Sequence, residues 1–232
     1  MSKYQFFRNR VGVEVGDKSL GANKKFAMTK VKNNLAFDRS PTKSQVIIND
    51  SEELVDCIVS HDDKMWEKRF LFRPDTYYPL GTYVTVDNGD YGVQTYLAWK
   101  RTTDSLYPQL FGVLCNTYYE IVTGKKTITT GYDSTGLPIR EIVEEKRRVK
   151  CHATTQAYSA LSNSAIPLPS GAMNIYIPYD VEYANLIKLN DKYVNKHAEY
   201  KVIEIVREHV LEESNEGYLK IYLQREVDKF SE

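Results

Sequence analysis

Hydrophobic and polar residues alternate in short runs from residue 45 onward, which predicts strands with one buried face rather than long helices. Two such runs, 45–50 and 52–59, lie on either side of a polar break that contains Asp50. A short helix capped by Asp50 is the alternative for the second run. The β-branched residues of that run favour a strand instead, because their side chains fit a pleated surface well.

The clearest local pattern lies in residues 82–99, where Asn88 and Gly89 separate two β-rich runs. Both central residues of a type I′ turn need a positive φ, so this pair predicts a tight hairpin. A strand over 69–73 precedes the hairpin, and 107–122 supplies one or two more. Together with the first two runs these make about five or six short strands, which is enough for a small antiparallel barrel or sandwich.

The remainder of the chain continues in the same style, with strand patterns separated by polar and glycine-rich breaks. We expect a hairpin over 125–151, a loop or linker over 153–171, a strand over 173–178, a helix of two to three turns over 180–190 that begins at Asp180, and a closing hairpin formed by 200–211 and 218–226. The last of these runs alternates cleanly, with Leu219, Ile221 and Leu223 on one face.

The first 44 residues show no sustained periodicity, and we expect an extended or partly ordered N-terminal arm there. Residues 1–45 hold ten Lys and Arg against three acids, a balance of +7, whereas residues 199–232 hold nine acids against five bases, a balance of −4. Such asymmetry favours contact between the arm and an acidic surface. A solvated basic tail is the alternative. The candidate contact residues are Arg8, Arg10, Lys24, Lys25, Lys30 and Lys32.

We therefore predict a mainly β protein, with an extended basic arm over 1–44, a small β-barrel or sandwich over 45–124 and a second β-rich unit over 125–232. Segments 69–80 and 173–186 share the order strand, Pro, Asp, Tyr, Leu. This similarity raises the hypothesis that one small β unit is duplicated, with chance resemblance between β-rich segments as the alternative.

Motifs for catalysis and for metal or cofactor binding are incomplete. The segment Gly124–Thr127 resembles the end of a phosphate-binding loop but lacks the glycine required five positions before Gly124, where Tyr119 lies. Cys57 with His61 and Cys151 with His152 do not have the paired short spacings of a zinc site. We expect no enzyme activity, cofactor or metal, and three buried free thiols.

No apolar run reaches the length of about 18 residues that a membrane span needs, and the N-terminus lacks the apolar stretch of a signal peptide. We therefore expect a protein that is made in a cytoplasm and does not contact a membrane. A barrel that binds single-stranded nucleic acid is the main rival to a structural role, since such barrels combine aromatics with a basic groove. Without the arm, however, the rest of the chain has a balance of −7, which is unfavourable for tracking phosphates.

The first unit contains an acidic and then aromatic strand over Asp62–Phe72, a Pro-Leu-Gly-x-Tyr entry over Pro79–Val84 and an aromatic strand over Tyr91–Trp99. This order of motifs resembles small proteins at the head–tail junction of tailed bacteriophages. It covers roughly residues 45–122. The chain is about twice as long as the simplest members, so 125–232 is either a second unit that faces the tail or the mark of another tail component, such as a tail terminator or a baseplate protein.

The resemblance implies a head-closure or connector protein in the virion neck, which forms a homo-oligomeric ring of six or twelve copies. Such a ring would contact portal or adaptor proteins and tail proteins, keep packaged DNA inside the head and touch that DNA without reading its sequence. The chain has eighteen tyrosines, and tyrosine is enriched at protein interfaces. The candidate interface residues are Tyr83, Tyr91, Tyr96, Trp99, Tyr118 and Tyr119, with ordinary positions within the sheets as the alternative.

Overall fold

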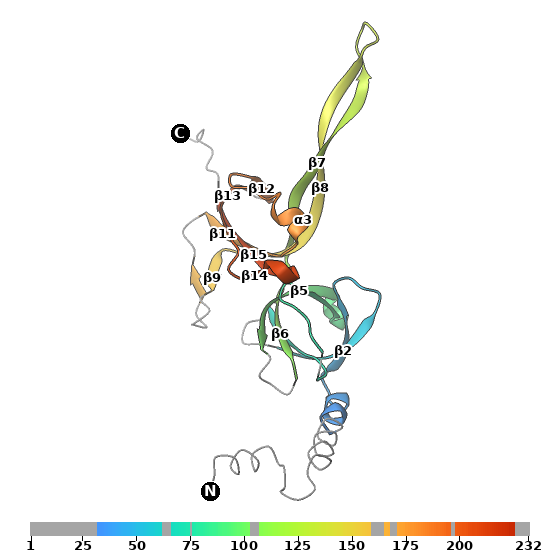
Figure 1. Ribbon diagram of the computed structural model, residues 1–232, viewed down its shortest axis with the longest axis vertical. Coiled ribbons are helices and arrows are strands. Elements are labelled where there is room, and N and C mark those ends of the chain that lie inside the picture. The colour runs from blue at the N-terminus through green and yellow to red at the C-terminus, as the bar shows by residue number, and fades with distance from the viewer. Residues whose placement is uncertain are drawn as a thin grey trace, which may run out of the picture.

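The computed structural model describes residues 32–61, 66–74, 76–102, 107–158, 165–167, 171–195 and 198–225. These residues form a closed antiparallel barrel and a second antiparallel β-sheet (Figure 1). The predicted fold class, mainly β with a small barrel and a second β-rich unit, is confirmed.

The barrel closes from six short strands in the order β1-β2-β3-β6-β5-β4. Its strands are β1 (Lys43–Ile48), β2 (Leu54–His61), β3 (Glu67–Leu71), β4 (Tyr83–Asp87), β5 (Val93–Thr102) and β6 (Gln109–Leu114). The second predicted run is thus a strand, and the helical alternative is wrong.

The interior of the barrel is filled by aliphatic and aromatic side chains that alternate along the strands. Phe70 and Tyr96 meet edge to face, with ring centroids 5.6 Å apart. Gly112 lies beneath them, and a Cβ at this position would come within 2.7 Å of the Phe70 ring. Glycine at 112 therefore lets two aromatic rings occupy a narrow barrel.

The second sheet has seven strands, six of them in the order β12-β13-β15-β11-β8-β7, with β14 paired to β15. The strands are β7 (Thr117–Tyr132), β8 (Pro138–Thr154), β11 (Ala172–Pro178), β12 (Lys192–Asn195), β13 (Ala198–Val206), β14 (Val210–Leu211) and β15 (Glu216–Arg225). Two further strands, β9 (Gln156–Tyr158) and β10 (Ala165–Pro167), pair with each other, and the short helices are η1 (Gly89–Tyr91), α3 (Val181–Ala184) and η2 (Glu212–Ser214).

The core of the second sheet follows from the period of two in its central strands. Leu219, Ile221 and Leu223 of β15 are fully buried, as predicted, and Ile175 of β11 packs beside them. The sheet curls so that its first and last strands approach each other. The ring of Tyr119 on β7 stacks on that of Tyr193 on β12, with centroids 5.4 Å apart.

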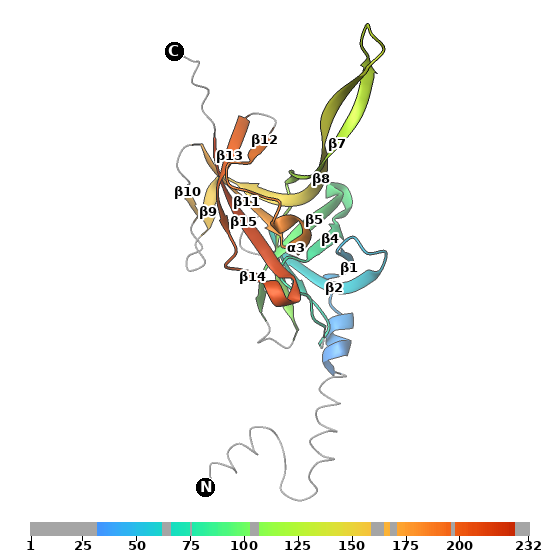
Figure 2. The same ribbon diagram turned by 45° about the horizontal axis from the view of Figure 1, so that its top comes forward.

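The barrel and the second sheet lie side by side (Figure 2), and they pack against each other through an aromatic and aliphatic cluster. Leu97 and Val113 on the outside of the barrel meet Tyr176 and Tyr218 of the sheet. A backbone contact accompanies the cluster, because the Gly217 N–H donates a hydrogen bond to the Leu80 carbonyl over 2.8 Å.

Several predicted details differ from the structure. The barrel ends with β6, and the predicted boundary at 124 falls inside β7, which pairs with β8 of the second sheet. The described residues of 153–171, predicted as a loop or linker, include the end of β8 and the strands β9 and β10, and the strand β12 was not predicted. The two units have different strand orders, so their strand connectivity does not support the hypothesis of a duplication.

The Asn88-Gly89 pair does not form the predicted type I′ turn, since Asn88 has a φ of −98° and Gly89 begins the short 3-10 helix η1. The Asn88 side chain instead accepts a hydrogen bond from Lys68 Nζ and donates one to Gln94 Oε1. These bonds at the end of the barrel override the local preference of the pair. The predicted helix from Asp180 exists, with the Asp180 carboxylate accepting from the Glu182 N–H, but it is a single turn.

Residues 32–38 are helical, although the sequence predicted an extended arm up to residue 44. The helix follows from its anchor, because the Phe37 side chain is fully buried against the barrel. This helix and the β7–β8 hairpin leave the molecule on opposite sides (Figure 1). Residues 1–31 lie outside the described part of the chain.

Candidate interaction surfaces

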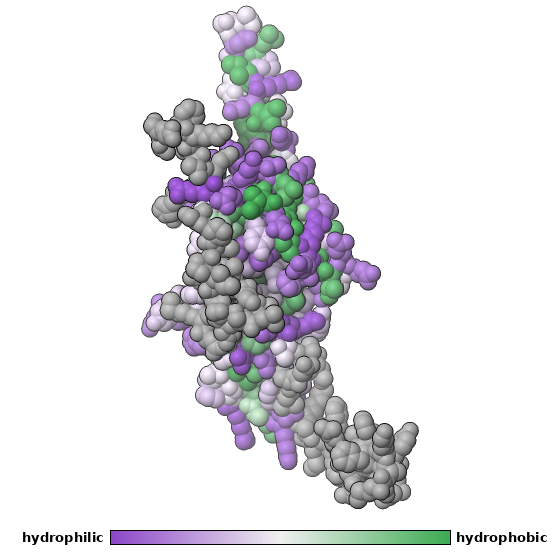
Figure 3. Space-filling view, turned by 90° about the vertical axis from the view of Figure 1, so that its left-hand side faces the viewer, coloured by the Kyte–Doolittle hydropathy of each residue, from purple (hydrophilic) through white to green (hydrophobic). Residues whose placement is uncertain are grey.

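The distal part of the β7–β8 hairpin, residues 122–146, projects from the body of the molecule, and we call it the ribbon (Figure 1). Both of its faces are exposed, and apolar side chains alternate with charged ones along it (Figure 3). Seven large apolar residues of the ribbon are between 38 and 72% exposed: Val122, Ile128, Tyr132, Leu137, Ile139, Ile142 and Val143.

The tip of the ribbon is held in one conformation by Asp133. Its Oδ1 accepts hydrogen bonds from the Thr135 hydroxyl at 2.6 Å, the Thr135 N–H at 2.8 Å and the Leu137 N–H at 2.9 Å. These bonds, that of the Thr135 hydroxyl first, hold the pKa of Asp133 below its ordinary value. The tip therefore presents Tyr132 and Leu137 from an ordered turn.

At its base the ribbon joins the body through charged contacts. The Arg147 guanidinium lies 5.3 Å from the centre of the Tyr183 ring of α3, and its Nη1 is 3.9 Å from the Glu182 carboxylate. On the other face, Arg148 Nε donates to Glu120 Oε1 over 2.9 Å. The free part of the ribbon begins beyond these residues.

A groove of about 840 Å³ lies beside this base, and we call it the base groove. It is bounded by the starts of β7 and β8, the edge strand β12 and one end of the barrel. Apolar side chains form much of its lining, together with polar groups of residues 116–120. The lining includes Trp66, Leu114, Tyr118, His152, Met173 and Val194.

His152 lines the base groove, and one nitrogen of its buried ring has no hydrogen-bond partner among the described residues. The side chain is 5% exposed, and its Nδ1 is 2.8 Å from the Leu114 carbonyl oxygen, which fixes the proton on Nδ1. Nε2 is then an acceptor, and within the described part of the chain no donor reaches it. Burial lowers the pKa of His152, so the ring is neutral at pH 7.

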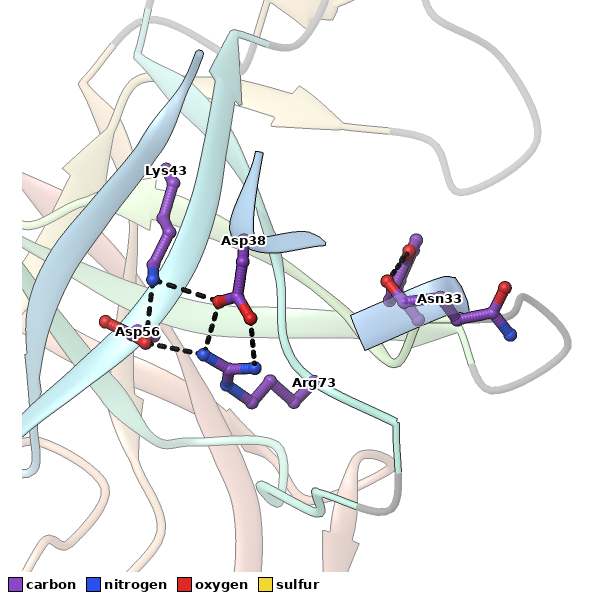
Figure 4. A network of polar contacts seen from close by, with 6 residues as sticks. Asn33, Asp38, Lys43, Asp56 and Arg73 are labelled. Carbon is purple, nitrogen blue, oxygen red and sulfur yellow. Dashed lines mark hydrogen bonds and ion pairs between the residues drawn. The ribbon is translucent and has the colours of Figure 1, made fainter. Parts of the chain in front are cut away.

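A charged network attaches the helix over residues 32–38 to the barrel (Figure 4). Arg73 Nη2 lies 2.6 Å from Asp38 Oδ1 and 2.8 Å from Asp56 Oδ2, and Lys43 Nζ lies 3.1 and 3.0 Å from the same two oxygens. Hydrogen bonds from Arg73, and then from Lys43, hold the pKa values of both carboxyl groups below their ordinary value.

An aromatic contact supports this network. The Phe37 ring lies under the Arg73 guanidinium, 5.0 Å away, and its centroid is 5.7 Å from that of Tyr107. The Tyr107 hydroxyl donates to the Asn33 carbonyl over 2.8 Å. The end of the barrel thus holds the start of the described chain in a defined place.

One row of the outer barrel surface combines cations with an aromatic ring. Arg69 of β3 and Lys100 of β5 both pair in register with Phe111 of β6. Their charged groups lie 5.1 and 5.0 Å from the centre of the Phe111 ring. This row has the chemistry of a stacking platform for single-stranded nucleic acid, on a small scale.

The six predicted interface residues fall into three environments. Tyr96 and Tyr119 are 3 and 2% exposed and belong to the two cores, so neither can contact another subunit. Tyr83 and Trp99 pack in the cluster between the barrel and the second sheet. Only Tyr91 and Tyr118 of the six are open to solvent, at 84 and 55%. Tyr118 lines the base groove.

Of the six predicted arm contacts, Arg8, Arg10, Lys24, Lys25 and Lys30 lie outside the described residues, while Lys32 is exposed at the start of the helix. Apart from Tyr118, the residues of the ribbon and of the base groove were not predicted as contact residues from the sequence. A usable signal existed for the ribbon, because 125–151 carries apolar residues at both even and odd positions of a predicted hairpin.

The cysteines of the two Cys–His pairs lie in the two cores, and the segment Gly124–Thr127 lies in a strand. Cys57 lies in the core of the barrel and Cys151 in that of the second sheet, so the two Cys–His pairs do not converge. Both cysteines are free and buried, and burial raises the pKa of the partly exposed Cys115 to about 12. Gly124–Thr127 is part of the extended strand β7. Among the described residues, no group of three His, Cys, Asp or Glu side chains is placed to hold a metal ion.

Comparison with known proteins links the second unit to phages. Residues 111–224 match the family described as the YomX C-terminal domain, which is of phage origin. The match begins in β6 and extends through β15, so it falls mostly outside residues 45–122, which carried the resemblance noted from the sequence. No curated protein and no solved structure matches the chain. In the described part of the chain, no helix has the length and apolar character required to cross a membrane.

Proposed function

We propose, from the similarity of residues 111–224 to a domain family of phage origin, that this chain is a structural protein of the phage virion. More specifically, we propose that copies of it form a ring of six or twelve at the neck, where the ring closes the DNA-filled head and docks the tail. The chain would act through its surfaces rather than by catalysis, with portal or adaptor proteins and tail proteins as its partners.

The observation that supports this role best is the placement of the contact elements. The anchored helix over residues 32–38 and the ribbon point away from the body on opposite sides (Figure 1). A protein between two assemblies needs a surface toward each, and the two β units separate the two surfaces. The arm that precedes the helix carries most of the positive charge of residues 1–45, which suits an acidic neighbour or packaged DNA.

Disruption of the gene in a phage that encodes the chain tests the proposal. Particles made without the protein should appear in electron micrographs as separate heads and tails, and the heads should have lost their DNA. A plasmid copy of the gene should restore joined particles. Normal, infectious particles in the absence of the protein would contradict a role in head closure, and heads with DNA but misassembled tails would indicate a tail component instead.

A barrel that binds single-stranded nucleic acid is the second candidate, favoured by the Arg69–Phe111–Lys100 row. Fluorescence anisotropy of a labelled oligonucleotide with a chain that lacks residues 1–31 tests it. Salt-sensitive binding that is lost in F111A would support this function. Absence of binding at low salt would remove it.

A further inference from the structure

We propose that the tip of the ribbon of one copy docks in the base groove of a second copy, so that the chain assembles by a repeated tip-to-groove contact. The inference rests on the proposed ring and names the contact that would build it. Four features of the described residues support it: the exposure of the ribbon, the area that it offers, the chemistry of the groove and the absence of a charge requirement on either side.

The ribbon has the properties of an element that is covered in its working state. A single pair of strands is only marginally stable in water unless its faces are packed. Within the described chain, the hydrogen bonds and ion pairs of residues 123–145 connect to other parts of the ribbon, as between Thr123 and Glu145 or between Lys146 and Glu144. Its apolar side chains therefore stay exposed on both faces unless another molecule covers them.

The area of the ribbon is sufficient for a stable contact when the ribbon lies along the neighbouring copy with its tip in that copy's base groove. The seven exposed apolar side chains offer roughly 50–100 Å² each, or about 400–600 Å² together. Because apolar atoms make up about 60% of a typical interface, the total area per copy would be roughly 700–1,000 Å². This range includes the value of about 800 Å² per partner that is usual for specific complexes.

The base groove complements the tip in its chemistry. Its apolar lining matches Leu137, because it includes Val194, which is 66% exposed, beside the buried Met173. Tyr132 at the tip combines an apolar ring with a phenolic O–H, which suits a groove that mixes apolar side chains with the polar groups of residues 116–120. A volume of about 840 Å³ accommodates several side chains.

Charge favours a second copy over a nucleic acid or another strongly charged partner. The ribbon carries four positive and four negative residues, so its net charge is zero: Lys125, Lys126, Arg140 and Lys146 against Asp133, Glu141, Glu144 and Glu145. The charged residues of the groove, Glu120 and Arg148, already pair with each other. Two neutral surfaces on the same chain need no oppositely charged partner.

Geometry determines the kind of assembly. About eleven residues of β7 separate the groove from the tip, which is roughly 35 Å of extended strand. The tip of one chain therefore cannot fill its own groove. A contact between two different surfaces is heterologous, and repetition of it yields a closed ring when the rotation between copies allows closure.

Two complementary variants of the full chain test the contact. Leu137→Asp changes the tip, Val194→Arg blocks the groove, and Leu54→Asp alters an exposed leucine of the barrel as the matched control. Light scattering coupled to size exclusion, at high protein concentration, should show assemblies for the wild type and L54D and monomers for L137D and V194R. An equimolar mixture of L137D and V194R should give dimers and nothing larger, because only one intact tip can meet one intact groove.

The mixture separates this contact from other forms of association. If wild type assembles while the mixture stays monomeric, or if either single variant still assembles, the tip-to-groove contact is wrong although the proposed ring stands. A wild type that stays monomeric at all concentrations also overturns the contact between copies. The proposed neck function is judged separately, by the heads and tails of phages that lack the protein.

Discussion

The joint between the barrel and the second sheet should be sensitive to one added methyl group at Gly81. This residue has a φ of +84°, and a Cβ built on it would lie 1.8 Å from the carbonyl oxygen of Gly217. No real contact is that short, so Gly81→Ala must force the two backbones apart. The hydrogen bond from the Gly217 N–H to the Leu80 carbonyl would be lost with that movement.

The expected cost has three parts. An alanine with positive φ costs about 1 kcal/mol, and the lost hydrogen bond costs about 1 kcal/mol. Partial exposure of the cluster around Tyr176 and Tyr218 adds roughly 1–2 kcal/mol. Gly81→Ala should therefore lower the free energy of unfolding by about 3–4 kcal/mol. Gly89→Ala is the matched control, since Gly89 also has a positive φ but a Cβ there meets nothing within 4 Å, and it should cost only about 1 kcal/mol.

Urea unfolding followed by tryptophan fluorescence measures both effects, because Trp66 and Trp99 both pack against the cluster at the joint. The native emission of G81A should already be shifted to the red, whereas that of G89A should match the wild type. If the two variants lose the same free energy within about 0.5 kcal/mol, the close approach of Gly81 and Gly217 does not hold the units together.

Three further outcomes are expected. Burial lowers the pKa of His152 in the folded protein below its value of about 6.5 in the unfolded chain, so the folded state binds a proton less readily. The free energy of unfolding should therefore fall as the pH drops from 7 to 5, and urea titrations should show this loss in the wild type but not in H152Q. Phe37→Ala should cost about 3 kcal/mol in the same assay and expose residues 32–38 to limited proteolysis, whereas equal cleavage in both proteins would argue against the anchor. Replacement of residues 124–144 by a two-residue turn should change the free energy of unfolding by less than about 1 kcal/mol, since the ribbon packs on no described core residue. A large decrease in the free energy of unfolding would show that the ribbon supports the fold.

The elements that could be predicted from the sequence are those in which local pattern and burial agree. The alternation of Leu219, Ile221 and Leu223 specifies one buried face, and the strand β15 uses it as predicted. The hairpin predicted over 125–151 is present in β7 and β8, although β7 already begins at Thr117. The Asn88-Gly89 turn was wrong because its outcome depended on Lys68, twenty residues earlier in the chain.

The candidate surfaces were harder to predict, because exposure depends on distant partners. Tyr96 and Tyr118 both lie in segments predicted as strands. Tyr96 is buried inside the closed barrel, whereas Tyr118 is exposed on the edge strand β7. The base groove exists because β12 curls back to β7, as the stacked rings of Tyr119 and Tyr193 show. No local rule connects residues that are more than seventy positions apart, so the groove could not be predicted from one sequence.

Cryo-electron microscopy of the neck in purified particles of a phage that encodes this chain tests the central claim most directly. A localised reconstruction should show a ring of six or twelve copies between head and tail, with the barrel and the second sheet of each copy resolved and the ribbon directed toward a neighbouring copy. Absence of the chain from purified particles, or its presence only at the distal end of the tail, would contradict the account.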